Sequence, residues 1–279
     1  MATITRVQDQ SAFVLHRYDW SESSLILEVW TRDFGRIAVV AKGAKKPASQ
    51  FRPILLPLQA LNIAWRGDSE VRTLRAASWV GGYVMPTGEA LLTGLYLNEL
   101  LLRMLARDDA HPRLFDLYAQ ATQALATRDT QTSNLALLVR CFELLLLREL
   151  GVLPDLSIEG ASLSPLLPNA LYTLHPEMGL LAVDPVDTNN QAITGAQWLL
   201  LMYQAAQAPS TDGSAHYEWQ QVMQACTGLS AKLRGQLRLL LQSHSGVRVF
   251  KTRQMWLDVN AMGSQSLGPV AVPVGVIAL

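Results

Sequence analysis

Five cationic side chains with no carboxylate between them give the clearest chemical signal in the sequence. They are Arg36, Lys42, Lys45, Lys46 and Arg52, within a stretch of 17 residues. Ammonium and guanidinium groups on a segment that reaches solvent bind nucleic-acid phosphates without reading the base sequence. The nearby aromatic residues Trp30, Phe34 and Phe51 offer faces for base stacking, although the strand pattern around Trp30 favours a place in a core.

A second group of cations lies towards the end of the sequence, and two further arginines follow the first group. The second group is Lys232, Arg234, Arg238, Arg248, Lys251 and Arg253, and the further arginines are Arg72 and Arg75. The formal net charge is zero, yet residues 1–82 carry +4, residues 83–227 carry −9 and residues 228–279 carry +5. Two basic ends around an acidic middle favour a polyanionic partner, and the alternative is an ordinary solvated surface.

Arg140 stands in a run, residues 133–150, that is apolar on almost every side of a helix. Such a helix is buried in a bundle, and the charges at Arg140, Glu143, Arg148 and Glu149 argue against a membrane span. Glu143 lies about 60° from Arg140 around the helix, so the two can form a structural ion pair. The second interpretation is a cation at the rim of an apolar groove, suited to a peptide that ends in hydrophobic residues and a carboxylate.

The common signatures of catalysis are missing from the sequence. It has no P-loop, no Gly-x-Gly-x-x-Gly, no His-Glu-x-x-His and no Gly-x-Ser-x-Gly. Its five histidines are scattered, and neither Cys141 nor Cys226 has a Cys or His partner at metal-ligand spacing. A nuclease would need clustered carboxylates for a metal pair, and the basic ends hold few acids. We therefore expect no enzyme and no cofactor, with a nuclease-like enzyme or a pure protein adaptor as the alternatives.

Size and composition are typical of a globular protein with about two domains. Of the 279 residues, 49% are hydrophobic and 16% are charged, which excludes a disordered chain. Residues 1–8 lack the apolar centre of a signal peptide. The apolar run 269–279 is too short to span a bilayer and is interrupted by Pro273. These features predict a cytoplasmic protein without a membrane partner.

The elements that must position the cations fall into two groups. Residues 11–82 read as five short strands, which is typical of a small closed barrel, and the basic loop from Gly43 to Pro53 fits an OB-fold. Helical periodicity then predicts helices at 88–105, 113–126, 133–150, 217–225 and 230–242. A capping box at Thr194 and Gln197 predicts one more helix. Residues 152–192 are rich in loop formers and contain a candidate hairpin at 171–183.

Several short motifs, read in order along the chain, point to a known family. They are Ala12-Phe-Val-Leu-His, Trp20-Ser-Glu-Ser-Ser-Leu, Gly35-Arg, Ala41-Lys-Gly-Ala44, Thr73-Leu-Arg75, Gly94-Leu-Tyr-Leu-Asn-Glu-Leu-Leu, Arg140-x-Phe142-Glu143 followed by Leu150-Gly151, and Phe250-Lys-Thr-Arg253. Their order and spacing resemble the RecO family of bacterial recombination mediators and DNA-repair proteins. The resemblance covers roughly residues 11–256 and is strongest in the first 105.

The resemblance implies binding to single- and double-stranded DNA, annealing of complementary strands, and help in loading RecA onto strands coated by single-strand-binding protein (SSB). The implied partners are RecR, the C-terminal tail of SSB and, indirectly, RecA. Many relatives carry a four-cysteine zinc site after the central helix, but residues 152–192 contain no cysteine, so we expect no zinc. The hydrophobic SSB-tail pocket of the family maps by motif onto the central helix, at Leu138, Arg140, Leu144 and Leu147.

Together these observations predict an α+β protein with an N-terminal five-stranded OB-fold barrel and a mostly α-helical remainder. Residues 1–82 are the expected nucleic-acid-binding domain. Residues 83–256 are the expected helical domain, interrupted by the insertion at 152–192. Residues 257–279 are expected to form a flexible tail. The two groups of cations, with Arg72 and Arg75, are the expected DNA-binding residues of a non-enzymatic protein associated with the bacterial nucleoid.

Overall fold

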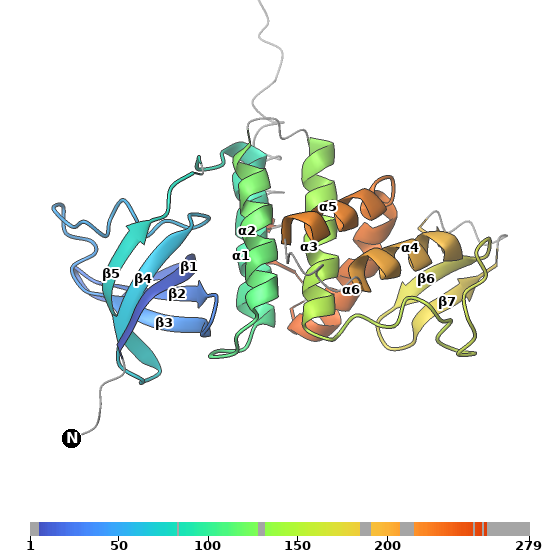
Figure 1. Ribbon diagram of the computed structural model, residues 1–279, viewed down its shortest axis with the longest axis horizontal. Coiled ribbons are helices and arrows are strands. Elements are labelled where there is room, and N and C mark those ends of the chain that lie inside the picture. The colour runs from blue at the N-terminus through green and yellow to red at the C-terminus, as the bar shows by residue number, and fades with distance from the viewer. Residues whose placement is uncertain are drawn as a thin grey trace, which may run out of the picture.

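The computed structural model describes residues 6–82, 84–127, 132–184, 191–206, 215–247, 249–252 and 254–255. A β-barrel at one end of the molecule leads through a helical middle to a small sheet at the other end (Figure 1). The tail expected at 257–279 lies outside the described residues, as do the candidate DNA-binding residues Arg248 and Arg253.

The first five strands close into a barrel. They are β1 (Arg6–Asp19), β2 (Leu25–Thr31), β3 (Gly35–Ala41), β4 (Leu61–Arg66) and β5 (Val71–Trp79). The strand order is β1-β2-β3-β5-β4, and the barrel closes because β1 pairs with both β2 and β4. Strands β3 and β5 run parallel to each other, while the remaining pairs are antiparallel. The barrel confirms the predicted OB-fold.

Strand β1 begins five residues earlier than the sequence pattern predicts, at Arg6 instead of residue 11. Its pairing shifts register between Val7 and Gln10 and again between Val14 and His16. A bulge inserts an extra residue into one strand, so side chains beyond it change face and the alternating pattern is lost. This explains why the polar start of β1 carries no recognisable strand signal.

Within the described residues, six helices follow the barrel, with an insertion between the third and the fourth. They are α1 (Gly88–Met104), α2 (Pro112–Ala126), α3 (Thr132–Glu149), α4 (Gly195–Ala206), α5 (Ala215–Cys226) and α6 (Ser230–Ser245). The predicted central helix is confirmed, because α3 contacts α1, α2, α5 and α6 and the side chains from Leu144 to Leu147 are fully buried. The predicted capping box is also present: Gln197 N donates to Thr194 Oγ1 over 3.4 Å, and Thr194 N donates to Gln197 Oε1 over 3.3 Å.

The insertion contains the predicted hairpin, β6 (Leu171–His175) and β7 (Gly179–Val183), and a short strand β8 (Ile193–Thr194) that adds to β6. The buried side chain of Gln236 ties this sheet to α6. Its Oε1 accepts from Leu174 N over 2.5 Å, and its Nε2 donates to Gln191 O over 2.8 Å. A polar residue in an otherwise apolar helix face is thus explained by two backbone partners.

A buried carboxylate joins the barrel to the helices. Glu28 of β2 pairs with Arg36 of β3 over 3.0 Å and with Arg107, which lies in the connection between α1 and α2. Gly35 allows this connection to approach closely, because a Cβ there would lie 2.1 Å from Asp109 O. Two guanidinium groups on one carboxylate offset the cost of burying its charge. We call Glu28, Arg36 and Arg107 the barrel clamp.

Further contacts extend the junction between barrel and helices. Arg32 of the barrel forms two hydrogen bonds, of 2.9 and 2.8 Å, to the carboxylate of Asp116 in α2. Phe13 and the fully buried Trp30 pack their rings against Phe115 and Tyr118 of α2. The core position favoured for Trp30 from the strand pattern is therefore confirmed. The barrel and the helices share one continuous hydrophobic core at this junction.

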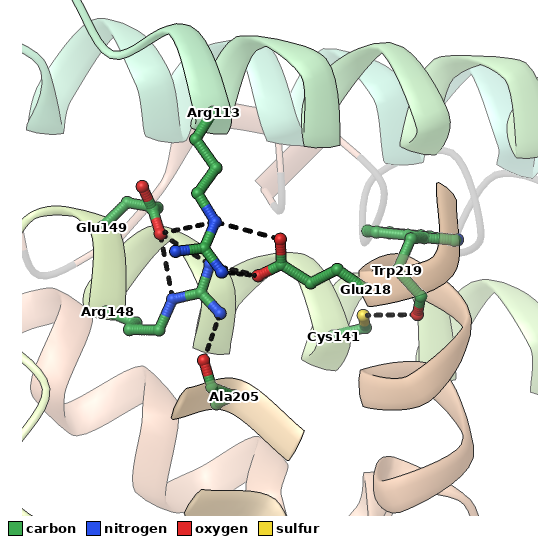
Figure 2. Close-up of polar contacts among 7 residues, drawn as sticks. All are labelled: Arg113, Cys141, Arg148, Glu149, Ala205, Glu218 and Trp219. Atoms are coloured by element: carbon green, nitrogen blue, oxygen red, sulfur yellow. Dashed lines mark hydrogen bonds and ion pairs between the residues drawn. The ribbon is translucent and has the colours of Figure 1, made fainter. Parts of the chain in front are cut away.

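A second buried ion cluster holds the helices together (Figure 2). Arg113 of α2 and Arg148 of α3 meet the carboxylate of Glu218 in α5, with N–O distances of 2.8 and 2.5 Å. Arg148 also pairs with the neighbouring Glu149 over 2.6 Å and donates to Ala205 O of α4 over 2.5 Å. We call Arg113, Arg148, Glu149 and Glu218 the helix clamp; its residues come from the three helices α2, α3 and α5, and α4 adds the acceptor Ala205 O.

Candidate functional site

The basic loop lies where β3 ends. Residues 42–57 fold as a series of turns, and the side chains of Lys42, Lys46 and Arg52 are exposed. Lys45 is partly buried, and its Nζ lies 3.2 Å from the carboxylate of Asp19 at the end of β1. The structure therefore keeps four of the five predicted cations of the first group on one loop, three of them facing solvent.

A pocket of ≈ 450 Å³ opens between this loop and the adjacent ends of β1 and β2. We call it the loop pocket. Its lining residues are Arg17, Asp19, Leu25, Ala44, Lys45, Phe51, Arg52 and Leu55. The sequence gives no sign that Arg17 belongs to this site, because it stands alone, 19 residues before Arg36, the nearest cation of the first group.

Two predicted DNA-binding arginines instead have structural partners. Arg36 belongs to the barrel clamp, and its Nε also donates to Leu105 O over 3.2 Å. The Arg72 side chain is only 16% exposed and pairs with Asp108 over 2.6 Å. Both carboxylates come from other elements, so the local sequence gives no sign of either pair. We therefore exclude Arg36 and Arg72 from the candidate DNA surface and keep Arg75, which is exposed on β5.

The described members of the second group of cations do not form one stripe. Arg234 and Arg238 lie on α6 and line a second pocket, described next, together with Arg140. Lys232 is partly buried and Lys251 is exposed beyond the end of α6. Within the described part of the chain, the structure thus assigns two of these cations to a pocket in the helical region.

The second pocket has a volume of ≈ 440 Å³, and we call it the groove pocket. Faces of three helices and the segment after α6 converge on it. Its lining residues are Glu89, Leu92, Thr93 and Tyr96 of α1, Leu135, Ala136, Val139, Arg140 and Glu143 of α3, Ser230, Ala231, Arg234 and Arg238 of α6, and Val249, Phe250 and Thr252. Each helix contributes residues at spacings of three or four, which place side chains on one helical face.

Arg140 and Glu143 form the ion pair expected from their spacing, with Nη1 and Oε2 2.7 Å apart. Arg140 also donates to Arg234 O over 3.5 Å, and Tyr96 donates to Glu143 Oε1 over 2.6 Å. Burial raises the pKa of the Glu143 carboxyl, while the charges of Arg140 and Arg234 and the Tyr96 hydrogen bond oppose this effect. Arg140 also lines the groove pocket. Its position therefore agrees both with a structural ion pair to Glu143 and with a cation beside an apolar groove.

Three predicted peptide-binding leucines lie in the core instead of the groove pocket. Leu138, Leu144 and Leu147 are 3%, 0% and 0% exposed. Leu138 lies on the opposite side of α3 from Arg140. Leu144 and Leu147 lie within about 40° of Arg140 around the helix, but one and two turns further along, where other elements cover the same face. The apolar lining comes from Leu92, Leu135, Val139, Val249 and Phe250.

The segment Val249–Thr252 is fixed to α1 by a carboxylate. Glu99 accepts hydrogen bonds from Lys251 N over 2.8 Å, from Thr252 N over 2.8 Å and from Thr252 Oγ1 over 2.7 Å. Phe250 packs edge-on against Tyr96, with ring centroids 5.5 Å apart. These contacts explain two of the motifs near residues 94–101 and 250–253, because together they build one wall of the groove pocket.

The buried position of Glu143 predicts a pH-dependent effect on stability. A raised pKa in the folded state means that the stabilising contribution is complete below the unfolded pKa of about 4.3 and is lost as the pH rises through the folded value. We expect the stability of the native chain, relative to Glu143→Gln, to fall between pH 4 and pH 7. Urea unfolding of both proteins at the two pH values measures this difference, and a constant difference would contradict the prediction.

Two absences concern the described residues only. Across that part of the chain, no group of three or more His, Cys, Asp or Glu side chains is placed to hold a metal ion. Among the helices described, none combines the length and the apolar character that crossing a membrane requires.

The fold defines the class of protein. It is an OB-fold barrel joined to a helical region, and barrels of this type commonly bind oligonucleotides. Comparison with known families agrees: the pattern for the recombination protein O N terminus matches residues 5–83, and the pattern for its C terminus matches residues 85–209.

Full-length relatives lead to the same assignment. DNA repair protein RecO of Polaromonas sp. (strain JS666 / ATCC BAA-500) is 54% identical over 262 residues, covering 94% of this chain and 100% of that protein. The protein of the same name from Variovorax paradoxus is 52% identical, with 94% and 100% coverage. The one from Polaromonas naphthalenivorans is 52% identical, with 92% and 98% coverage. The chain therefore belongs to the RecO family of DNA repair proteins.

Proposed function

We propose that the protein is a recombination mediator that binds single- and double-stranded DNA through its barrel and anneals complementary strands. The observation that carries this proposal is the exposed loop cations Lys42, Lys46 and Arg52 beside the loop pocket of an OB-fold. Annealing needs no nucleophile, because cations that screen two phosphate backbones leave the bases able to pair. The protein then acts without a cofactor, at the nucleoid of the bacterial cytoplasm.

We further propose that the groove pocket binds the C-terminal tail of SSB, and that the protein works with RecR to help RecA load onto SSB-coated strands. Arg140, Arg234 and Arg238 surround a largely apolar lining, which suits a peptide with acidic and hydrophobic residues. Family membership supports the same partners.

Annealing of complementary oligonucleotides over a salt series, with and without SSB, tests the proposed activity. We expect the protein to accelerate annealing of free strands and of SSB-coated strands, with the rate falling as salt rises. Loss of strands in the presence of magnesium would instead indicate a nuclease. DNA binding confined to very low salt would indicate a protein adaptor.

The loop cations give a quantitative prediction. Replacing Lys42, Lys46 and Arg52 by Ala should weaken binding about equally for all DNA sequences. It should also reduce the steepness of the plot of log K against log[salt] by up to about 3, because each lost phosphate contact removes about one unit of slope. The matched control replaces the exposed Arg6, Arg66 and Arg103 by Ala.

The control removes the same charge at positions away from the loop. Arg6 and Arg66 are opposite each other in the pairing of β1 with β4, at the end of β1 that is far from the loop. Titrations by fluorescence anisotropy at several salt concentrations measure the slope for each protein. Equal slopes for the loop variant and the control would mean that the loop makes no phosphate contacts of its own.

A further inference from the structure

The loop pocket has a feature that phosphate binding alone does not need, namely an apolar floor with an aromatic ring. Leu25 and Phe51 pack partly against the barrel core and also line the pocket, beside Ala44 and Leu55. An ordinary phosphate-binding surface needs only cations and backbone N–H groups that reach the DNA backbone. The pocket therefore combines two chemistries, an apolar surface and a cationic rim.

Local hydrogen bonds fix the position of Phe51. Its backbone O accepts from Ile54 N over 3.1 Å and from Leu55 N over 3.0 Å, and its backbone N donates to Ser49 Oγ over 3.3 Å. The ring is thus held by a tight turn on one side and by the barrel core on the other. An aromatic ring that is already fixed loses little conformational entropy when a flat ligand stacks on it.

The cations lie around this floor. Arg17 donates from Nη1 to Leu55 O over 3.3 Å, which anchors its side chain at the pocket. Arg52 is exposed, and Lys45 pairs with the highly exposed Asp19, so the rim carries three positive charges and one negative charge. A ligand with one flat apolar part and one anionic part matches this arrangement.

We propose that the loop pocket accepts a single unstacked nucleotide of a DNA strand, with its base against Phe51 and its phosphate near Arg17 and Arg52. The proposal rests on the proposed DNA binding and specifies how part of it works. A pocket of ≈ 450 Å³ is within the range of small-ligand sites, about 300–1,000 Å³. Every base has a flat face, so the contact tolerates any sequence.

The pocket then distinguishes single strands from duplexes. A paired base can enter only after it leaves its stack, which costs a few kcal/mol, whereas a single strand offers unstacked bases freely. When a complementary strand arrives, base pairing competes with Phe51 for the same base. The site thus holds a strand in a conformation that is open to pairing and releases the base once the pair forms.

The negative charge of Asp19 predicts the direction in which a substitution at the pocket rim changes binding. Its carboxylate occupies Lys45 and repels a phosphate at the same rim. We therefore expect Asp19→Asn to strengthen binding of single-stranded DNA several-fold. A purely structural pair would leave binding unchanged or weaken it.

The test compares two labelled oligonucleotides of equal length and charge, poly(dT) and an abasic strand, by fluorescence anisotropy at one salt concentration. We expect the native chain to bind poly(dT) about five- to a hundredfold more tightly. Phe51→Ala should remove most of this preference, and Phe51→Tyr should keep it. Tyr203→Ala is the matched control, because Tyr203 is an aromatic residue that is 62% exposed and lies on α4, outside the barrel.

Each outcome has a definite meaning once melting curves show that the variants are folded. Equal binding of both oligonucleotides by the native chain would overturn the nucleotide pocket while leaving backbone binding in place. A preference that Phe51→Ala keeps would also overturn it. Absence of binding to either strand at moderate salt would reject the proposed DNA binding itself, so the two failures differ.

Discussion

Glu218→Ala should lower the melting temperature by roughly 6–20 °C, the largest stability loss that we expect from one substitution. Glu218 lies at the centre of the helix clamp, where its side chain is 7% exposed and meets both Arg113 and Arg148. Removing one partner of a buried ion pair costs about 3–5 kcal/mol, because the remaining charges stay buried. For a chain of this size, each kcal/mol shifts the melting temperature by roughly 2–4 °C.

Asp116→Ala provides the control for this prediction. Asp116 also forms a two-bonded pair with an arginine, Arg32, but the two side chains are 37% and 42% exposed. Solvent-exposed pairs contribute about 0–1 kcal/mol, so this variant should melt within a few degrees of the native chain. Similar losses in the two variants, measured by circular dichroism or calorimetry, would mean that burial does not govern the strength of the helix clamp.

Arg140→Ala should weaken binding of a labelled SSB tail peptide by roughly ten- to a hundredfold. Charge-assisted hydrogen bonds from a guanidinium group contribute about 1.5–3 kcal/mol. Arg234→Ala should also weaken binding of the peptide, because Arg234 lines the same groove pocket. DNA affinity should hardly change in either variant, since the loop cations remain.

The ion pair complicates Arg140→Ala, because the substitution leaves the buried Glu143 without its guanidinium partner. The double variant Arg140→Ala/Glu143→Gln removes that charge and separates stability from binding. Fluorescence anisotropy of the peptide and a melting curve should be measured on the same samples. If the folded double variant binds the peptide as tightly as the native chain, Arg140 has a structural role only.

Local periodicity was sufficient to predict most elements of the fold. The strand around Val29 and the helix around Phe142 are each specified by side chains a few residues apart, and both are present. The strand order could not be predicted, because β3 pairs in parallel with β5 and not with β4, the next strand in the sequence. This pairing places Val39 opposite Arg72. Thr87 stands at the N-cap position of α1 but makes no side-chain capping hydrogen bond.

The same distinction applies to the candidate sites. The loop cations could be predicted because they are close in sequence and free of neighbouring acids. The structural role of Arg72 could not, since its partner Asp108 lies 36 residues away. The wall of the groove pocket depends on Glu99 and Thr252, which are 153 residues apart. Contacts of this range leave no periodic trace in the sequence.

The barrel clamp has a consequence for ligands that carry two binding groups. Glu28, Arg36 and Arg107 attach the barrel to the connection between α1 and α2, so the loop pocket and the groove pocket keep a fixed separation. Once one group of a bivalent ligand is bound, the second meets its site at an effective concentration that reaches the millimolar range if the linker spans the distance. A DNA strand bound at the loop pocket and a protein attached to that strand and bound at the groove pocket would together bind with strong avidity, even if each contact alone is weak. A ligand whose linker is too short to reach both pockets gains no avidity.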